Sequence, residues 1–147
     1  MAIRCAFGRM QTIVYRDITR SQSEKRTPVA PDPTAFRSRL TPDSVLLFRY
    51  TALTFNAHRI HYDHIYATKA EAYPGLVLHG PLQATLLLNL AADALNETSH
   101  GFSFRGLASL TLPCEMQLNC RREGATGTVW CQDETSLCCF SADYSGS

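Results

Sequence analysis

The amino-acid sequence predicts an α+β fold in which one buried helix packs against an antiparallel sheet. The first observation is a leucine-rich segment after Gly80, "PLQATLLLNLAADAL", which is apolar around most of a helical circumference. The second is a change, from Phe102 onward, to short strand-like segments separated by glycine, proline and polar turns. The third is a length of 147 residues with 45% hydrophobic content, which suits one ordinary core and a single domain.

Two helices are expected from their caps and apolar spacing. Thr41 is a suitable N-cap and Pro42 a suitable first helical residue, so the first helix is expected over residues 42–54. Gly80 and Pro81 open the second, over residues 81–95. The apolar positions at helical spacing are Leu46, Leu47, Tyr50 and Leu53 in the first helix, and Leu82, Leu86, Leu87, Leu90, Ala91 and Ala94 in the second.

Strand-like segments account for the rest of the predicted domain. A short strand is expected at residues 35–40, before the first helix, and four more at residues 102–112, 114–122, 126–133 and 137–144. Pro113, Gly124 and Gly127 supply turns between them. The sequence contains no internal repeat.

The chain divides near residue 34. Residues 1–34 hold a strand candidate at 11–18, "QTIVYRDI", and then a polar, proline-rich linker, whereas residues 35–147 form the predicted domain. The net charge is only +1, and the basic residues concentrate before Thr41, where acidic residues interrupt them. A solvated linker is therefore favoured over a nucleic-acid or membrane arm, and no nucleic-acid partner is expected.

No apolar run approaches the ~18 residues of a membrane span, so no membrane partner is expected. The expected location is the cytoplasm. A mitochondrial location is the alternative, because the residues before Asp17 carry arginines and no acid, as transit peptides do. The six cysteines show no C-x-x-C pair and are expected to be reduced core thiols.

The segment "FNAHRIHYDH", residues 55–64, holds three of the five histidines. Such a loop is a metal site, an acid–base site or a polar turn. His58, His61 and His64 are spaced by three, but such steps do not bring three rings onto one point without a tailored turn, and no H-E-x-x-H pattern is present. No metal is therefore expected. An imidazole with a pKa near 6.5 suits proton transfer at neutral pH.

"FNAHRIHYDHIYA" followed by "YPGLVLHGPLQATLL" resembles the MaoC-like hot-dog hydratases and dehydratases. The resemblance is strongest to their mesaconyl-CoA and itaconyl-CoA hydratase branch, which is related to mitochondrial hydroxyacyl-thioester dehydratases, and it runs from about Gln11 to the C-terminus. It implies a single hot-dog fold over residues 35–147. Members of the branch are longer, with a degenerate N-terminal hot dog, whose last strand residues 11–18 would represent.

The resemblance also implies catalytic residues. The wider family pairs an aspartate with a histidine, and those positions are held here by Asn56 and His61. Because an amide cannot take a proton from water, Asn56 is expected to orient water or substrate while His61 carries the acid–base chemistry. Gly80, at a helix start, is expected to donate its backbone N–H to the thioester oxygen.

Other residues have expected roles in substrate binding. His58 and Arg59 are expected to hold a substrate carboxylate or a coenzyme A phosphate, and Arg105 to reach a phosphate, with solvated arginines as the alternative. Tyr62, with Asp63, is expected either to orient His61 or to close a turn. His79 is expected to be a packed, hydrogen-bonded histidine.

The implied activity is reversible hydration of a 2-enoyl thioester, or dehydration of a 3-hydroxyacyl thioester, with mesaconyl-CoA or itaconyl-CoA as candidate substrates. No separate cofactor is expected, because coenzyme A or pantetheine is carried by the substrate. The alternatives are a hot-dog thioesterase, in which Glu71 or Asp63 would supply the carboxylate, or a non-catalytic subunit that binds acyl thioesters. A single hot dog leaves a sheet edge open, so a homodimer or a pairing with another hot-dog subunit is expected.

Overall fold

The computed structural model describes Met10, Thr12 and residues 36–96 and 98–146. Apart from Met10 and Thr12, the expected N-terminal segment of residues 1–34, with its strand at 11–18, lies outside these residues.

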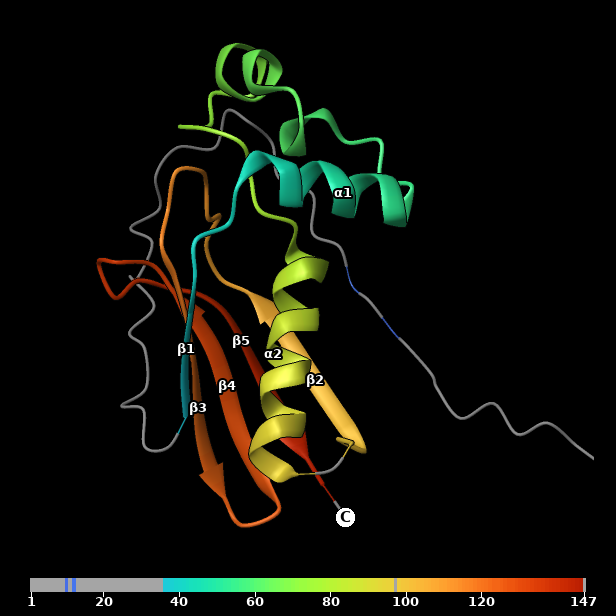
Figure 1. Cartoon of the computed structure of the whole chain (residues 1–147), viewed down its shortest axis with the longest axis vertical. Helices are drawn as coiled ribbons and strands as arrows, with labels where there is room; N and C mark the ends of the chain where they lie inside the picture. Colours follow the sequence, from blue (N-terminus) through green and yellow to red (C-terminus); the bar gives the residue numbers. More distant parts are fainter. Residues whose placement is uncertain (1–9, 11, 13–35, 97, 147) are drawn as a thin grey trace, which may run out of the picture.

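The described strands form one antiparallel sheet in the order β1-β3-β4-β5-β2, so β1 and β2 stand at its two ends (Figure 1). The strands are β1 (Phe36–Leu40), β2 (Gly101–Gly106), β3 (Met116–Glu123), β4 (Thr126–Gln132) and β5 (Cys138–Ser145). All five lie within a residue or two of their expected positions, except that β2 is shorter than expected.

Strand β2 ends at Gly106 because the hydrogen-bond ladder to β5 stops there. The N–H groups of Leu107 and Ala108 both donate to Cys139 O, and the chain then leaves the sheet. It pairs instead with the segment before the second helix, where Leu78 N donates to Leu110 O at 2.8 Å. The residues expected to extend β2 therefore hold this segment in place.

The long helix α2 (Gly80–Leu95) lies along one face of the sheet, as the sequence predicts (Figure 1). Its buried side chains are Leu82, Gln83, Ala84, Leu87, Leu90, Ala91, Ala94 and Leu95. The apolar ones pack with sheet residues such as Val129 and Phe140 in one core cluster. Burying a leucine contributes about 1.5–3 kcal/mol, so this face anchors the helix. Asn96 ends α2 in a left-handed conformation, and Arg122 donates to the free Ala94 carbonyl.

The first helix, α1, spans Ser44–Thr54 and starts two residues later than expected. The predicted cap at Thr41 is wrong: Asp43 is the N-cap, and its Oδ1 accepts a hydrogen bond from Leu46 N at 2.7 Å. Aspartate satisfies a free helical N–H as well as threonine does. Leu47 is buried in the core, whereas Leu53 is 78% exposed, so only part of the apolar stripe packs.

Four cysteines, Cys120, Cys131, Cys138 and Cys139, lie buried as free thiols, and Cys114 is half-buried and also free. Burial raises the pKa of each of the five. Among the described residues, no helix is both long enough and apolar enough to cross a membrane.

Candidate functional site

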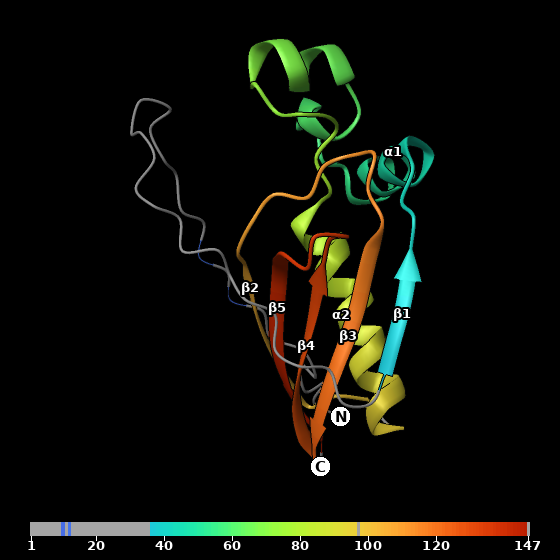
Figure 2. The same cartoon turned by 90° about the vertical axis from the view of Figure 1, so that its left-hand side faces the viewer.

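The histidine loop, residues 55–64, lies beyond the end of the sheet at which α2 begins (Figures 1 and 2). Phe55 ends α1 in a left-handed conformation with φ of 52°, which turns the chain away from the helix axis. Asn56 N donates to Thr51 O at 3.0 Å, and Asn56 Oδ1 accepts from His58 N at 3.0 Å. Within this turn the side-chain oxygen of Asn56 is occupied by the hydrogen bond from His58 N. The side-chain amide nitrogen of Asn56 is then the group that can donate to a ligand.

His61 closes a short 3₁₀ turn, η1 (Arg59–His61), and is only 7% exposed. Its Nδ1 lies 2.7 Å from Val77 O. The same Val77 donates its N–H to Ile60 O at 3.0 Å. Two hydrogen bonds in opposite directions therefore join the loop to the segment that leads into α2, and they position the His61 ring.

The bond to Val77 determines which nitrogen of His61 is basic. A carbonyl oxygen only accepts, so Nδ1 carries the hydrogen and Nε2 of the neutral ring has the lone pair. Burial lowers the pKa of His61, the Val77 bond partly opposes this, and the nearby His58 lowers it further. His61 is therefore neutral at pH 7, and its Nε2 has a lone pair that can accept a proton.

His79 lies directly against His61. The two rings stack with centroids 3.7 Å apart and planes 19° apart. His79 is fully buried, its Nε2 lies 2.9 Å from Thr51 Oγ1, and the Tyr50 ring meets it edge-on at 4.9 Å. Burial and, secondarily, the charge of His61 lower the pKa of His79 from 6.5 to about 4. We call His61 and His79 the histidine pair.

Sequence reasoning described His79 only as a packed, hydrogen-bonded histidine. The structure confirms the packing and one hydrogen bond, but the contact with His61 was not predicted. The signal was the position of His79 immediately before Gly80 in "HGP". Nothing in the spacing of 18 residues between the two histidines indicates that their rings touch.

Gly80 is the first residue of α2, with His79 as the N-cap. The N–H groups of a first helical turn have no acceptor within the helix and lie at the positive end of its dipole. Gln83 N donates to His79 O at 3.1 Å, and Pro81 has no N–H. The backbone N–H of Gly80 therefore directly follows His79 of the histidine pair along the chain.

Arg59 is exposed and already paired. Its Nη2 and Nε donate to Asp63 Oδ2 at 2.7 and 3.2 Å, and its guanidinium lies 4.3 Å from the centre of the Tyr66 ring. Asp63 also accepts from Tyr66 N, and Glu71 accepts from the Tyr66 hydroxyl at 2.8 Å. Both carboxylates named for a thioesterase are thus engaged within the segment that includes the π-helical turn η2 (Tyr66–Ala70).

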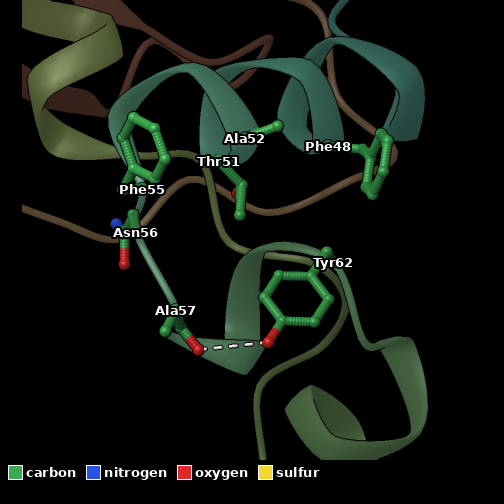
Figure 3. Close-up of a pocket in the computed structure, with 7 residues that line it drawn as sticks. All are labelled: Phe48, Thr51, Ala52, Phe55, Asn56, Ala57 and Tyr62. Carbon is green, nitrogen blue, oxygen red and sulfur yellow. Dashed lines mark hydrogen bonds between the residues drawn. The ribbon is translucent and has the colours of Figure 1, made fainter.

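Of the other expected substrate contacts, His58 touches the histidine pair, whereas Tyr62 bonds elsewhere in the loop. His58 is exposed and meets the His61 ring edge-on at 5.7 Å. Tyr62 donates from its hydroxyl to Ala57 O at 3.1 Å, so it closes the turn and does not bond His61 (Figure 3).

Arg105 is an exposed residue of β2. Its neighbour Phe104 stacks on the buried Phe140 at 5.6 Å. Because side chains alternate along a strand, Arg105 faces the other side of the sheet from Phe104, and the structure does not bring it to the histidine pair. Its role as a substrate contact stays a prediction.

In the described part of the chain, no three histidine, cysteine, aspartate or glutamate side chains converge as metal ligands. The alternative of a metal held by His58, His61 and His64 therefore lacks a converging ligand set there.

A pocket of about 280 Å³ opens beside the loop. Its walls are Phe48, Thr51, Ala52, Phe55, Asn56, Ala57 and Tyr62 (Figure 3). Thr51 belongs both to this wall and to the hydrogen bond with His79. The side chain of Thr51 therefore separates the pocket from the histidine pair. The residues that line the pocket carry no formal charge.

Comparison with known proteins points to one family. The model of the family described as hydroxyacyl-thioester dehydratase type 2 matches residues 3–112, which include most of the basic N-terminal segment. The chain is 51% identical over 102 residues to a mesaconyl-C(4)-CoA hydratase from Chloroflexus aurantiacus, covering 68% of this chain and 36% of that protein. It is 41% identical over 93 residues to a mitochondrial hydroxyacyl-thioester dehydratase type 2 from Schizosaccharomyces pombe, covering 61% and 30%. The chain thus spans about a third of the length of these relatives.

Solved structures agree on the fold. HtdX from Mycobacterium tuberculosis aligns with a TM-score of 0.69 at 19% identity, over 88% of this chain and 49% of that one. A MaoC-like dehydratase from Phytophthora capsici aligns with a TM-score of 0.66 at 9% identity, over 86% and 46%. The hot-dog fold expected from the sequence motifs is confirmed.

Proposed function

Because this chain belongs to the hydroxyacyl-thioester dehydratase type 2 family, we propose that it catalyses the reversible hydration of a 2-enoyl thioester. The observation that carries the proposal is the buried His61, whose Nδ1 is engaged by Val77 O and whose Nε2 is therefore a free base. The Gly80 N–H at the start of α2 supplies the second group that this chemistry needs.

In the hydration direction, His61 Nε2 accepts a proton from water while the hydroxyl oxygen adds to C3 of the enoyl group. The displaced electron pair moves to the thioester oxygen, where Gly80 N–H donates to the developing negative charge. His61 then returns the proton to C2, so the protein is unchanged and one water has been added. Asn56 donates from its amide nitrogen to hold the water. Dehydration is the same sequence reversed.

The carrier, coenzyme A or pantetheine, is part of the proposed substrate, and no separate cofactor is consumed. The uncharged pocket beside Asn56 suits an acyl group of modest size. His58 and Arg59, both exposed beside it, are suited to a substrate carboxylate or a carrier phosphate, although Arg59 would then share its guanidinium with Asp63. Mesaconyl-CoA and itaconyl-CoA are the first dicarboxylic candidates.

An assay with crotonyl-CoA and mesaconyl-CoA tests the proposal. We expect the absorbance of the conjugated enoyl thioester to fall without release of free thiol, and mass spectrometry to find the product heavier by one water. Release of free thiol would identify a thioesterase instead. Binding without either change would identify a non-catalytic subunit, and either result would reject the hydratase.

Restoring the family carboxylate is a test within the site. Asn56→Asp keeps an oxygen to accept from His58 N, so the turn should survive. We expect activity to be retained and the acidic limb of the kcat/KM profile to move to higher pH, because a nearby carboxylate raises the pKa of a histidine that must be neutral to act as base. Asn56→Ala, which removes the amide, should lower kcat. Wild-type kcat in folded Asn56→Ala would contradict a water-holding role here.

We propose that the chain assembles as a homodimer or with another hot-dog subunit. Strands β1 and β2 end the sheet, and large apolar side chains are exposed on α1 and the segment after it. Leu53 is 78% and Ile65 74% exposed, and neither lines the pocket.

Light scattering of the purified chain at micromolar concentration should therefore give the mass of a dimer. The double variant Leu53→Glu with Ile65→Glu should shift it toward the monomer. A folded wild-type monomer would refute the homodimer.

A further inference from the structure

The histidine pair contains a residue for which the proposed reaction has no chemical use. His79 is fully buried, and its pKa is lowered to about 4, so it is neutral at pH 7 and does not supply a charge. Among the described residues, its Nδ1 has no hydrogen-bond partner. Burying an imidazole nitrogen without a partner is unfavourable, so the presence of histidine here calls for an explanation.

The surroundings of His79 restrain its ring on several sides. Thr51 Oγ1, from α1, lies 2.9 Å from Nε2, and the Tyr50 ring, from the same helix, packs edge-on at 4.9 Å. The backbone of His79 is the N-cap of α2, and Gln83 N donates to its carbonyl. The ring is therefore held between two helices and presents one flat face to His61.

His61 needs such a surface. The ring torsion of histidine has broad minima, so one hydrogen bond at Nδ1 does not hold its plane by itself. Val77 O selects Nδ1 as the nitrogen that carries the hydrogen. The stacked ring of His79, with its centroid 3.7 Å away, restricts rotation of the His61 ring about the hydrogen bond to Val77. Together the two contacts determine the direction in which the Nε2 lone pair points.

We propose that His79 is a positioning residue that holds the His61 ring plane through ring stacking and is itself anchored by Thr51; this rests on the proposed acid–base role of His61. Among the described residues, the other titratable side chains whose rings meet the pair are Tyr50, against His79, and His58, edge-on to His61. Arg59 and Asp63 are paired with each other on the outer side of the loop.

Two substitutions of similar size separate ring shape from imidazole chemistry. His79→Phe keeps a flat ring and loses the Thr51 bond, whereas His79→Leu fills the space without a flat face. We expect His79→Leu to lower kcat on crotonyl-CoA by up to roughly 10²-fold with little change in KM, since small misplacements of a catalytic group cost that much. His79→Phe should lose far less kcat than His79→Leu, because the flat face against His61 and the packing against Tyr50 remain although the Thr51 bond is lost. His64→Leu, at an exposed loop histidine, is the matched control and should change neither value.

A second measurement needs no substrate. In protein labelled with ¹⁵N at histidine, two-bond correlation spectra should show His61 as a single Nδ1–H tautomer in the wild type and His79→Phe, and as a mixture of tautomers in His79→Leu. Wild-type kcat and tautomer in folded His79→Leu would overturn the positioning role. So would an equal loss of kcat in both variants, because the imidazole and not the flat ring would then matter. Absence of hydration by the wild type would reject the proposed function and leave the tautomer experiment as the test of positioning.

Discussion

The variant His61→Asn is expected to lower kcat for hydration of an enoyl thioester by roughly 10²–10⁴-fold, the usual contribution of a positioned proton-transfer group. Asparagine is the sharpest replacement because its amide nitrogen can donate to Val77 O in place of Nδ1, so the bond that joins the loop to the segment before α2 is kept. The amide has no basic nitrogen to replace Nε2. The loss should therefore fall on kcat more than on folding, and steady-state kinetics with circular dichroism checks both.

His64→Asn is the matched control for this experiment. His64 belongs to the same loop and is exposed, so the same substitution there should leave kcat within about twofold of the wild type, as surface changes usually do. A metal site built on the loop histidines would respond to both changes with loss of bound metal. Equal turnover by the wild type and His61→Asn would refute the acid–base role.

Acid should destabilise the fold through His79. Its pKa is about 4 in the folded chain and near 6.5 when unfolded, so between these values the unfolded state binds a proton that the folded state does not. Stability contributed by this group is complete above pH 6.5 and falls as the pH drops toward 4. The loss amounts to about 3 kcal/mol, from 1.36 kcal/mol for each pH unit of the difference. Burial lowers the pKa of His61 too and adds a loss of the same sign.

Urea unfolding between pH 7.5 and pH 4 measures this effect. Carboxylates also titrate in this range, and the pKa of Asp63, for example, is lowered mainly by its bond from Tyr66 N. The informative quantity is therefore the difference between the wild type and His79→Phe, which removes only the buried imidazole. The variant should lose about 3 kcal/mol less over this range. The same pH dependence in both proteins would show that His79 is protonated normally in the folded state. His64→Phe, at an exposed site, should behave as the wild type does.

Local residue patterns were enough to predict most of the secondary structure. The apolar circumference of α2 identifies a buried helix because a helix with so little polar surface must be covered on most sides. The strand segments follow from β-branched and aromatic runs bounded by turn residues. The start of α1 was predicted two residues too early, because Asp43 and Thr41 both suit an N-cap and only the chain path decides between them.

Two candidate site residues, Asn56 and His61, were predicted from the sequence because their motif is contiguous and resembles that of a known family, and their roles stay predictions. Gly80 was predicted as a backbone donor from its place at a helix start together with the histidine motif upstream. These assignments depend on interactions within a few residues along the chain, which sequence spacing determines.

The tertiary structure alone decided the surroundings of His61. Val77 O accepts a hydrogen bond from His61 Nδ1, the ring of His79 stacks on that of His61, and the Thr51 hydroxyl lies against His79. Val77 and His79 belong to the segment before α2, whereas Thr51 belongs to α1. They meet because Leu110 pairs with Leu78 and holds the segment before α2 beside the loop. The contacts around His61 therefore depend on the residue at which β2 stops pairing with β5. Local residue propensities do not determine that residue. The sequence by itself predicted His61 as the candidate base, whereas tertiary packing decided which of its nitrogens carries the lone pair and which ring stacks against it.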